Sequence, residues 1–104
     1  MNTMRPIHPG EVLKEEFAEI NMSTNAFAQV LHVVANRITA ILNGARSIPA
    51  DTALRISFFF GTTPEFWLNL QTSYDLKVTR ESVGKKVEQE VRSFIPTMPH
   101  LTHA

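Results

Sequence analysis

The segment from Ser23 to Gly44, STNAFAQVLHVVANRITAILNG, decides the fold of this chain. Ser23 is suited to cap a helix, and Asn43 followed by Gly44 is a strong helix stop. Between them, the apolar residues follow the period of two short helices joined by a tight turn near His32. This is the layout of a helix-turn-helix, a motif whose second helix lies in the major groove of DNA.

Length and composition describe one ordinary globular domain. The chain has 104 residues, of which 43% are hydrophobic and 19% charged. It contains no cysteine, which excludes disulfides and suits a reducing compartment. The sequence shows no apolar run long enough to span a membrane and no signal peptide over residues 1–10. We therefore expect a cytoplasmic protein with no membrane partner.

The charges are unevenly placed along the chain. The formal net charge is zero, whereas nucleic-acid binders are usually basic. Residues 24–62, however, hold Arg37, Arg46 and Arg55 against Asp51 alone, while residues 1–23 are net acidic. The positive charge therefore coincides with the candidate reading unit, and a dimer would double it.

Helix starts, helix stops and apolar periodicity predict an all-α chain of five helices. The first three are expected over about 9–21, 23–31 and 34–43, the fourth between Pro49 and Gly61, and the fifth from near Pro64 until it fades before Arg80. The residues expected to face the core are Val12, Leu13, Phe17 and Ile20, then Ile38, Ile41 and Leu42, then Ala53, Ile56, Ser57 and Phe60.

The chain is expected to divide into three parts. Residues 1–79 form the helix-turn-helix domain, including a fifth helix that pairs two copies. An amphipathic segment over 83–94 predicts a helical extension over 80–95. The final residues, PTMPHLTHA, include two prolines and little to bury, so we expect a disordered tail over 96–104.

Four blocks of sequence carry a family resemblance: HPGEVLKEEF (8–17), ANRITAILNGARSI (35–48), ADTALRI (50–56) and GTTPEFWLNLQTSYDL (61–76). They resemble the HigA/VapI branch of the lambda-repressor-like XRE family, whose members are small bacterial DNA-binding proteins and usually antitoxins. The resemblance implies a five-helix domain that binds operator DNA as a homodimer. It also implies a toxin partner, a small ribonuclease of the HigB type.

The rotation of the third helix separates a buried edge from an outward edge. If Ile38 and Ile41 are buried, Asn36, Thr39 and Ala40 point outward. Asn36 can pair with adenine, Thr39 can bond a base, and Ala40 can pack on a thymine methyl. The resemblance assigns base contacts to Ala35, Asn36, Arg37, Thr39 and Ala40. It assigns phosphate contacts, which fix register without reading sequence, to Thr24, Asn43 and Arg46.

Several of these residues also have plainer explanations. Asn36 lies near a helix start, where asparagine often serves as a cap. Arg37 points partly sideways, which leaves both phosphate contact and guanine readout open. Arg46 can be a solvated loop charge, Arg55 is more typical of an ion pair within the protein, and Asn43 is explained by the helix stop.

The turn of the motif departs from the family pattern at two residues. His32 occupies a position that usually holds glycine because the backbone there favours positive φ, and histidine is among the residues that tolerate this region. Val34 opens the third helix, where Pro or Ser is common. Because valine offers no capping group, we expect modest DNA affinity or an unusual target.

The fifth helix carries apolar residues on more than one face, which favours a homodimer. Repressors of this kind gain affinity by binding two half-sites about one DNA turn apart. Phe58 is expected near the surface, where an exposed aromatic indicates an interface with a second copy or a toxin. The alternative is that all these residues belong to the core. The predicted dimer interface comprises Phe58, Phe66, Trp67, Leu68, Leu70, Tyr74 and Leu76.

The sequence offers little for catalysis. It contains no phosphate loop and no nucleophile–base arrangement, so we expect no enzymatic activity and no cofactor. His8, Glu11 and Glu15 have a spacing that could hold a metal, but a capping histidine beside solvated acids explains them better. His100 and His103 could bind metal only nonspecifically, and no metal site is expected.

These observations predict a sequence-specific transcriptional repressor, the antitoxin of a HigB–HigA-type pair that autoregulates its operon. One alternative is a protein-interaction module that captures a toxin and binds DNA weakly, which the salt dependence of operator binding would distinguish. Another is a solitary regulator without a toxin. A short basic open reading frame immediately upstream would argue against that alternative.

Overall fold

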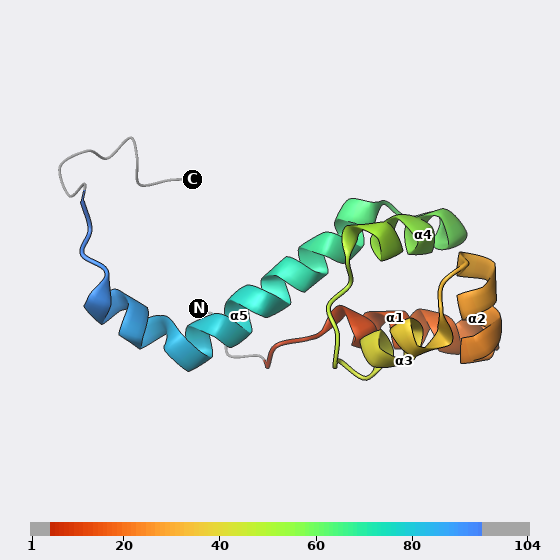
Figure 1. The fold of residues 1–104 in the computed structure, drawn as a ribbon, viewed down its shortest axis with the longest axis horizontal. Helices are drawn as coiled ribbons and strands as arrows, with labels where there is room; N and C mark the ends of the chain where they lie inside the picture. The colour runs from red at the N-terminus through yellow and green to blue at the C-terminus, as the bar shows by residue number, and fades with distance from the viewer. Residues whose placement is uncertain (1–4, 95–104) are drawn as a thin grey trace.

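The computed structural model describes residues 5–94, and within this range the chain is built from helices alone (Figure 1). The elements are α1 Pro9–Ile20, α2 Thr24–Leu31, α3 Ala35–Leu42, α4 Ala50–Phe60 and α5 Pro64–Glu90. The all-α prediction with five helices is therefore confirmed. The predicted disordered tail over 96–104 lies outside the described residues. In the described part of the chain, no helix is long and apolar enough to cross a membrane.

The local signals that start and end the helices act as expected. The Ser23 Oγ accepts a hydrogen bond from the Ala26 N–H at 3.1 Å, and the Thr63 Oγ1 accepts one from the Phe66 N–H at 3.2 Å. The turn between α2 and α3 places His32 in the left-handed region with φ 59°. Val34 precedes α3 and makes no side-chain cap, also as predicted.

One apolar core joins all five helices, and most of the predicted inward residues line it. Leu42 and Phe60 pack at its margin, and Ser57 is buried. Ile20 was also expected to face the core, but it is exposed at the last position of α1. The buried apolar residues of the core are Leu13, Phe27, Ala28, Leu31, Ile38, Ile41, Ile48, Ala53, Ile56 and Trp67.

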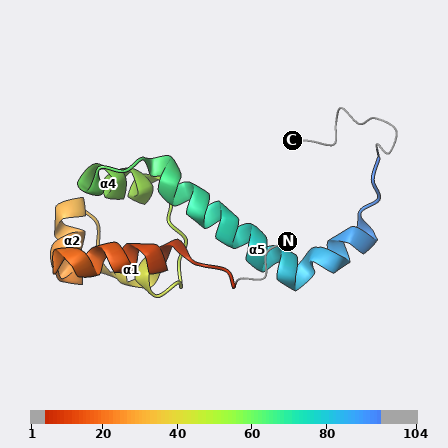
Figure 2. The ribbon, with the colours of Figure 1, turned by 180° about the vertical axis from the view of Figure 1, so that it is seen from behind.

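The last helix differs from the prediction, because α5 continues past Arg80 to Glu90 without a break. The residues 91–94, which were expected to be helical, lie beyond it. Gln71 is the last buried residue of α5, and its Oε1 accepts a hydrogen bond from the Ile48 N–H at 2.9 Å. The second half of α5 projects away from the body formed by the other helices (Figures 1 and 2).

The start of α1 is built around a capping histidine. The His8 Nδ1 accepts a hydrogen bond from the Gly10 N–H at 2.9 Å, and the Glu11 carboxylate accepts one from the His8 N–H at 3.3 Å. This confirms the capping explanation for His8. Arg5 donates two hydrogen bonds to Glu11, of 2.8 and 2.9 Å, which lower the pKa of Glu11 to about 2.

The first turn of α1 meets the end of α3 at very close range. A Cβ atom on Gly10 would overlap the carbonyl oxygen of Ile41, so only glycine permits this approach. The neighbouring His8 ring is buried and lies edge-on to the Tyr74 ring of α5, with centroids 4.9 Å apart. The same short segment therefore holds α3 on one side and α5 on the other.

We predict that Gly10→Ala lowers the free energy of unfolding by about 1–3 kcal/mol, because backbone of α1 or α3 must move to admit the methyl group. Chemical denaturation followed by circular dichroism measures this change. Gly84→Ala is the matched control, because its added Cβ would lie 3.7 Å from the Arg80 Cβ, an ordinary contact. That variant should gain helicity, since alanine favours a helix over glycine by about 0.5–1 kcal/mol. Equal stability of Gly10→Ala and the parent would contradict the close contact.

We also predict that stability falls as the pH drops below the ordinary histidine pKa of 6.5. Burial lowers the pKa of His8 in the folded protein, so in this window the unfolded chain binds the proton more readily. Protonation would also place a hydrogen on the Nδ1 that caps Gly10. Urea unfolding between pH 8 and about pH 5.5 should show this decrease in the free energy of unfolding. This range lies above the pH at which carboxylates titrate. His8→Asn keeps a capping side chain without titrating, so the same pH slope in that variant would rule out His8 as its source.

Candidate DNA-reading surface

The buried residues of α3 fix which of its side chains face outward. Ile38 and Ile41 are fully buried in the core. Asn36 and Thr39 lie on the opposite side and are exposed, and Ala40 is half-buried beside them. Ala35, at the first position of the helix, packs partly against the core. The outward polar edge predicted for this helix is therefore present, with small side chains around it.

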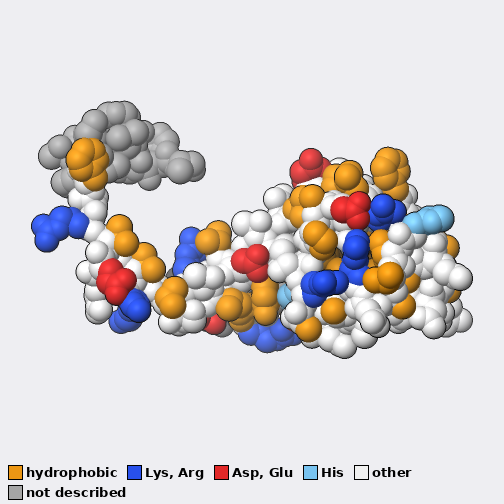
Figure 3. Space-filling view, in the orientation of Figure 1, with side chains coloured by type: hydrophobic (Ala, Val, Ile, Leu, Met, Phe, Trp, Pro, Cys, Tyr) orange, Lys and Arg blue, Asp and Glu red, His pale blue; other side chains and the backbone are white. Residues whose placement is uncertain are grey.

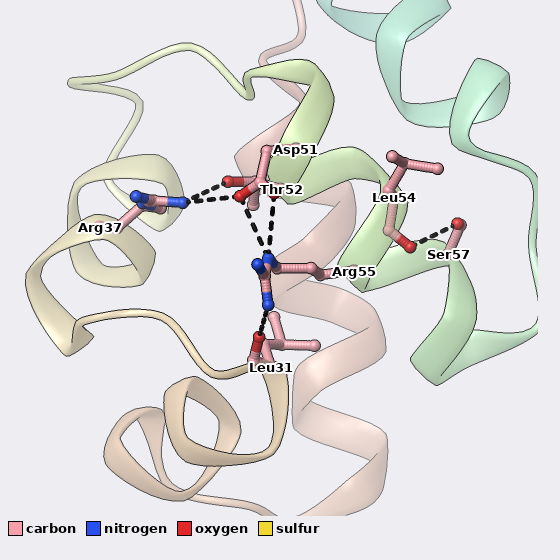
Figure 4. Close-up of polar contacts among 7 residues, drawn as sticks. All are labelled: Leu31, Arg37, Asp51, Thr52, Leu54, Arg55 and Ser57. Carbon is pink, nitrogen blue, oxygen red and sulfur yellow. Dashed lines mark hydrogen bonds and ion pairs between the residues drawn. The ribbon is translucent and has the colours of Figure 1, made fainter.

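Arg37 points from α3 toward the start of α4 (Figure 4). Its Nη1 donates hydrogen bonds to the Asp51 carboxylate and to the Thr52 Oγ1, both at 3.2 Å. These acceptors belong to the first turn of α4, so the guanidinium is directed sideways, as predicted. The side chain is half-buried as a result.

Arg55 completes a polar network that links α2, α3 and α4. Its Nε donates to both oxygens of Asp51, at 3.1 and 3.3 Å, and its Nη1 donates to the Leu31 carbonyl at 2.9 Å. The predicted ion-pair role of Arg55 is confirmed. The hydrogen bond from Arg55, with a smaller contribution from Arg37, lowers the pKa of Asp51.

The three predicted phosphate contacts frame the motif. Thr24 is the first residue of α2 and is half-buried, while Asn43 follows the last residue of α3 and is exposed. Arg46 is exposed in the loop between α3 and α4. Figure 3 shows Lys and Arg side chains in a row over the part of the body that holds α3 and α4. Positive charge therefore lies on the same face of the molecule as the helix-turn-helix.

The predicted dimer residues do not form one continuous surface. Trp67 is 1% exposed, and its Nε1 donates a hydrogen bond to the Thr62 Oγ1 at 2.9 Å. It belongs to the core of the subunit, and we correct its assignment to the interface, because no second chain could reach it. Leu68 and Leu70 also pack against the core, although they remain partly accessible. Phe58 is 86% exposed, as expected.

The other residues of the predicted dimer interface lie at two separate grooves. The larger, of about 580 Å³, lies between the N-terminal segment at Ile7 and α5, where Leu70, Tyr74 and Leu76 line it. The smaller, of about 310 Å³, lies between α2 and α4 and is lined by Phe58. Phe66 is exposed on the same side of α5 as Leu70, four residues earlier. The α5 residues thus share one surface, and Phe58 belongs to another.

Sequence reasoning missed the role of two polar residues at this site. Asp51 was considered only as the lone acidic residue among the arginines of residues 24–62, although its spacing from Arg55 favours an ion pair. Thr52, fully buried, accepts a hydrogen bond from Arg37 across 15 positions of sequence, and no local signal indicates it. Within residues 5–94, no group of three or more His, Asp or Glu side chains is placed to hold a metal ion.

Known proteins share this fold and sequence over most of their length, although no protein-family model matches the chain. Virulence-associated protein I of Dichelobacter nodosus is 43% identical over 96 residues, which cover 91% of this chain and 84% of that protein. An addiction module antidote protein of the HigA family from Coxiella burnetii has 61% identity and a TM-score of 0.83, covering 88% of this chain and all of the other. Antitoxin HigA of Pseudomonas aeruginosa, solved with the higBA promoter, has 40% identity and a TM-score of 0.83 over the same shares.

Each of these matches covers more than four fifths of this chain and of the relative. The chain belongs to the HigA/VapI family of lambda-repressor-like helix-turn-helix proteins.

Proposed function

We propose that the protein is a transcriptional repressor that binds operator DNA at its own promoter and serves as the antitoxin of a toxin–antitoxin pair. The observation that carries the proposal is the exposed edge of α3, with Asn36 and Thr39 directed away from the core. A relative that is 40% identical over the same fold was solved with its promoter. The relatives are named as antitoxins and transcriptional regulators rather than enzymes.

Base readout is proposed for the outward edge of α3. The amide of Asn36 carries an NH₂ donor group beside a carbonyl acceptor, which matches the major-groove edge of adenine. Thr39 can bond a base or contact a thymine methyl, and the small Ala35 and Ala40 let the helix sit deep in the groove. Arg37 contributes from the flank, where its pairing with Asp51 limits its reach.

Phosphate contacts are proposed for Thr24, Asn43 and Arg46. Thr24 lies at the N-terminus of α2, where free backbone N–H groups and the helix dipole favour an anion. Asn43 and Arg46 are exposed just beyond α3. Contacts of this kind orient the motif on the duplex and leave sequence discrimination to α3.

We propose that two copies act together through the exposed side of α5. Phe66 and Leu76 are exposed there, with Leu70 and Tyr74 at the groove beside Ile7. A single motif covers only half of an operator, and a dimer would place two reading helices on half-sites about one DNA turn apart. Repression would follow because the bound dimer blocks polymerase at the promoter.

A toxin of the HigB type is the proposed second partner, since several relatives are antitoxins. Phe58 is exposed on α4, away from the α5 groove, and so would remain accessible in the proposed dimer. We propose a cytoplasmic site of action, because operator DNA is the proposed target. The competing proposal is a module that captures a toxin and binds DNA only weakly, and it is favoured by the missing cap at Val34.

The test is a gel-shift and footprinting experiment on the DNA upstream of the protein's own gene, over a series of salt concentrations. The repressor proposal predicts protection of two half-sites one helical turn apart. It also predicts affinity that falls steeply with salt, because each neutralised phosphate contributes about 0.9 to the logarithmic slope. Equal, weak binding to the promoter and to unrelated DNA would favour the toxin-capture module instead.

Two variants separate base reading from phosphate anchoring. Asn36→Ala should relax preference at one operator position and weaken specific binding by about 1–3 kcal/mol. Arg46→Ala should weaken binding to all sequences alike and flatten the salt slope by about one unit. Competition against operators with single base changes measures the first effect, and salt titration the second. Unchanged specificity in Asn36→Ala, or a sequence-dependent loss in Arg46→Ala, would contradict the respective assignment.

A further inference from the structure

Asp51 lies where the reading helix meets α4, and it binds two arginines at once (Figure 4). Its carboxylate accepts hydrogen bonds from the Arg37 Nη1 at 3.2 Å and from the Arg55 Nε at 3.1 and 3.3 Å. The same Arg37 nitrogen donates to the Thr52 Oγ1, whose residue is fully buried. Two acceptors on one helix therefore fix the guanidinium of Arg37 beside the start of α4.

We propose that Asp51 is a positioning residue that sets how strictly the protein discriminates its operator from other DNA. The inference rests on the proposed DNA-binding function and deepens it. An arginine at the rim of a reading helix is attracted to any nearby phosphate, whatever the base sequence. By holding Arg37 sideways and offsetting its charge, Asp51 leaves the DNA-facing edge of α3 to Asn36 and Thr39, which are able to read bases.

The exposure of this ion pair argues that its main effect is not on folding. The Asp51 side chain is 57% exposed and the Arg37 side chain 31% exposed, and ion pairs this open to solvent add little stability. Arg55 has a separate anchor in the Leu31 carbonyl at 2.9 Å, which keeps α2 joined to α4 whatever residue stands at 51. The charge at position 51 can therefore be removed while the motif stays assembled.

The steric and charge roles of Asp51 can be separated by Asp51→Asn, which keeps its shape and removes its charge. Binding to the promoter and to unrelated DNA is measured over a salt series. We expect the salt slope for unrelated DNA to rise by about one unit, equivalent to about fivefold tighter binding near 0.15 M salt. Promoter affinity should change less, so the ratio of specific to nonspecific binding falls. Adding Arg37→Ala to Asp51→Asn should remove the gain, because Arg37 is the cation released.

Glu65→Gln is the matched control, because Glu65 is an exposed acid in the first turn of α5 and its loss changes net charge and helix dipole in the same way. The inference is overturned if this variant gives the same rise in slope, if Asp51→Asn gives none, or if the gain survives Arg37→Ala.

Thermal unfolding confirms that each variant is folded. If Asp51→Asn is not folded, Asp51→Ser is used in its place, and the same results would support or overturn the inference. If the parent protein does not bind its promoter more tightly than unrelated DNA, the proposed function itself is overturned. If the parent protein has this preference and Asp51→Asn keeps it unchanged, only this inference is overturned.

Discussion

Burial of Ile38 and Ile41 fixes the rotation of α3 about its own axis, and the arrangement of the reading surface depends on it. Each buried aliphatic side chain of this size contributes about 1.5–3 kcal/mol, whereas an exposed ion pair contributes about 0–1 kcal/mol. The apolar contacts therefore decide which edge of α3 faces outward. The contacts of Arg37 with α4 then adjust a single side chain on that edge without changing the helix that carries it.

The close approach of α1 to α3 extends this constraint through the domain. Because Gly10 has no side chain, the first turn of α1 rests on the carbonyl of Ile41, the same residue that anchors α3 in the core. The preceding His8 caps α1 and contacts Tyr74 on α5. One short segment thus relates the reading helix to the helix proposed for pairing, which explains why a buried histidine and a glycine occur two residues apart there.

The sequence was sufficient to predict features that depend on neighbouring residues, and insufficient for those that depend on distant ones. The cap at Ser23 and the positive φ of His32 follow from local chemistry, and the structure has both. The apolar period of α3 likewise predicted its exposed edge. The contact of Arg37 with Thr52 joins helices whose relative placement no local pattern specifies. The continuity of α5 was missed for a different reason, since the apolar stripe of its first half and the amphipathic segment from residue 83 do not follow a single period along the helix.

The burial of Trp67 has a consequence for how two copies could sit on DNA. With Trp67 in the core, the proposed dimer would pair through the exposed residues of α5, Phe66 and Leu76 beside the groove. A dimer must hold its reading helices about 34 Å apart to match one turn of DNA, so the joint between α5 and the body has to be rigid. Gln71 supplies part of that rigidity, because its side chain accepts a hydrogen bond from the Ile48 N–H in the loop that follows α3. If α5 pairs two copies and is fixed to this loop, the orientation of α5 determines where α3 lies in each copy. The distance between the two reading helices would then depend on the contact between α5 and the loop as well as on the dimer interface.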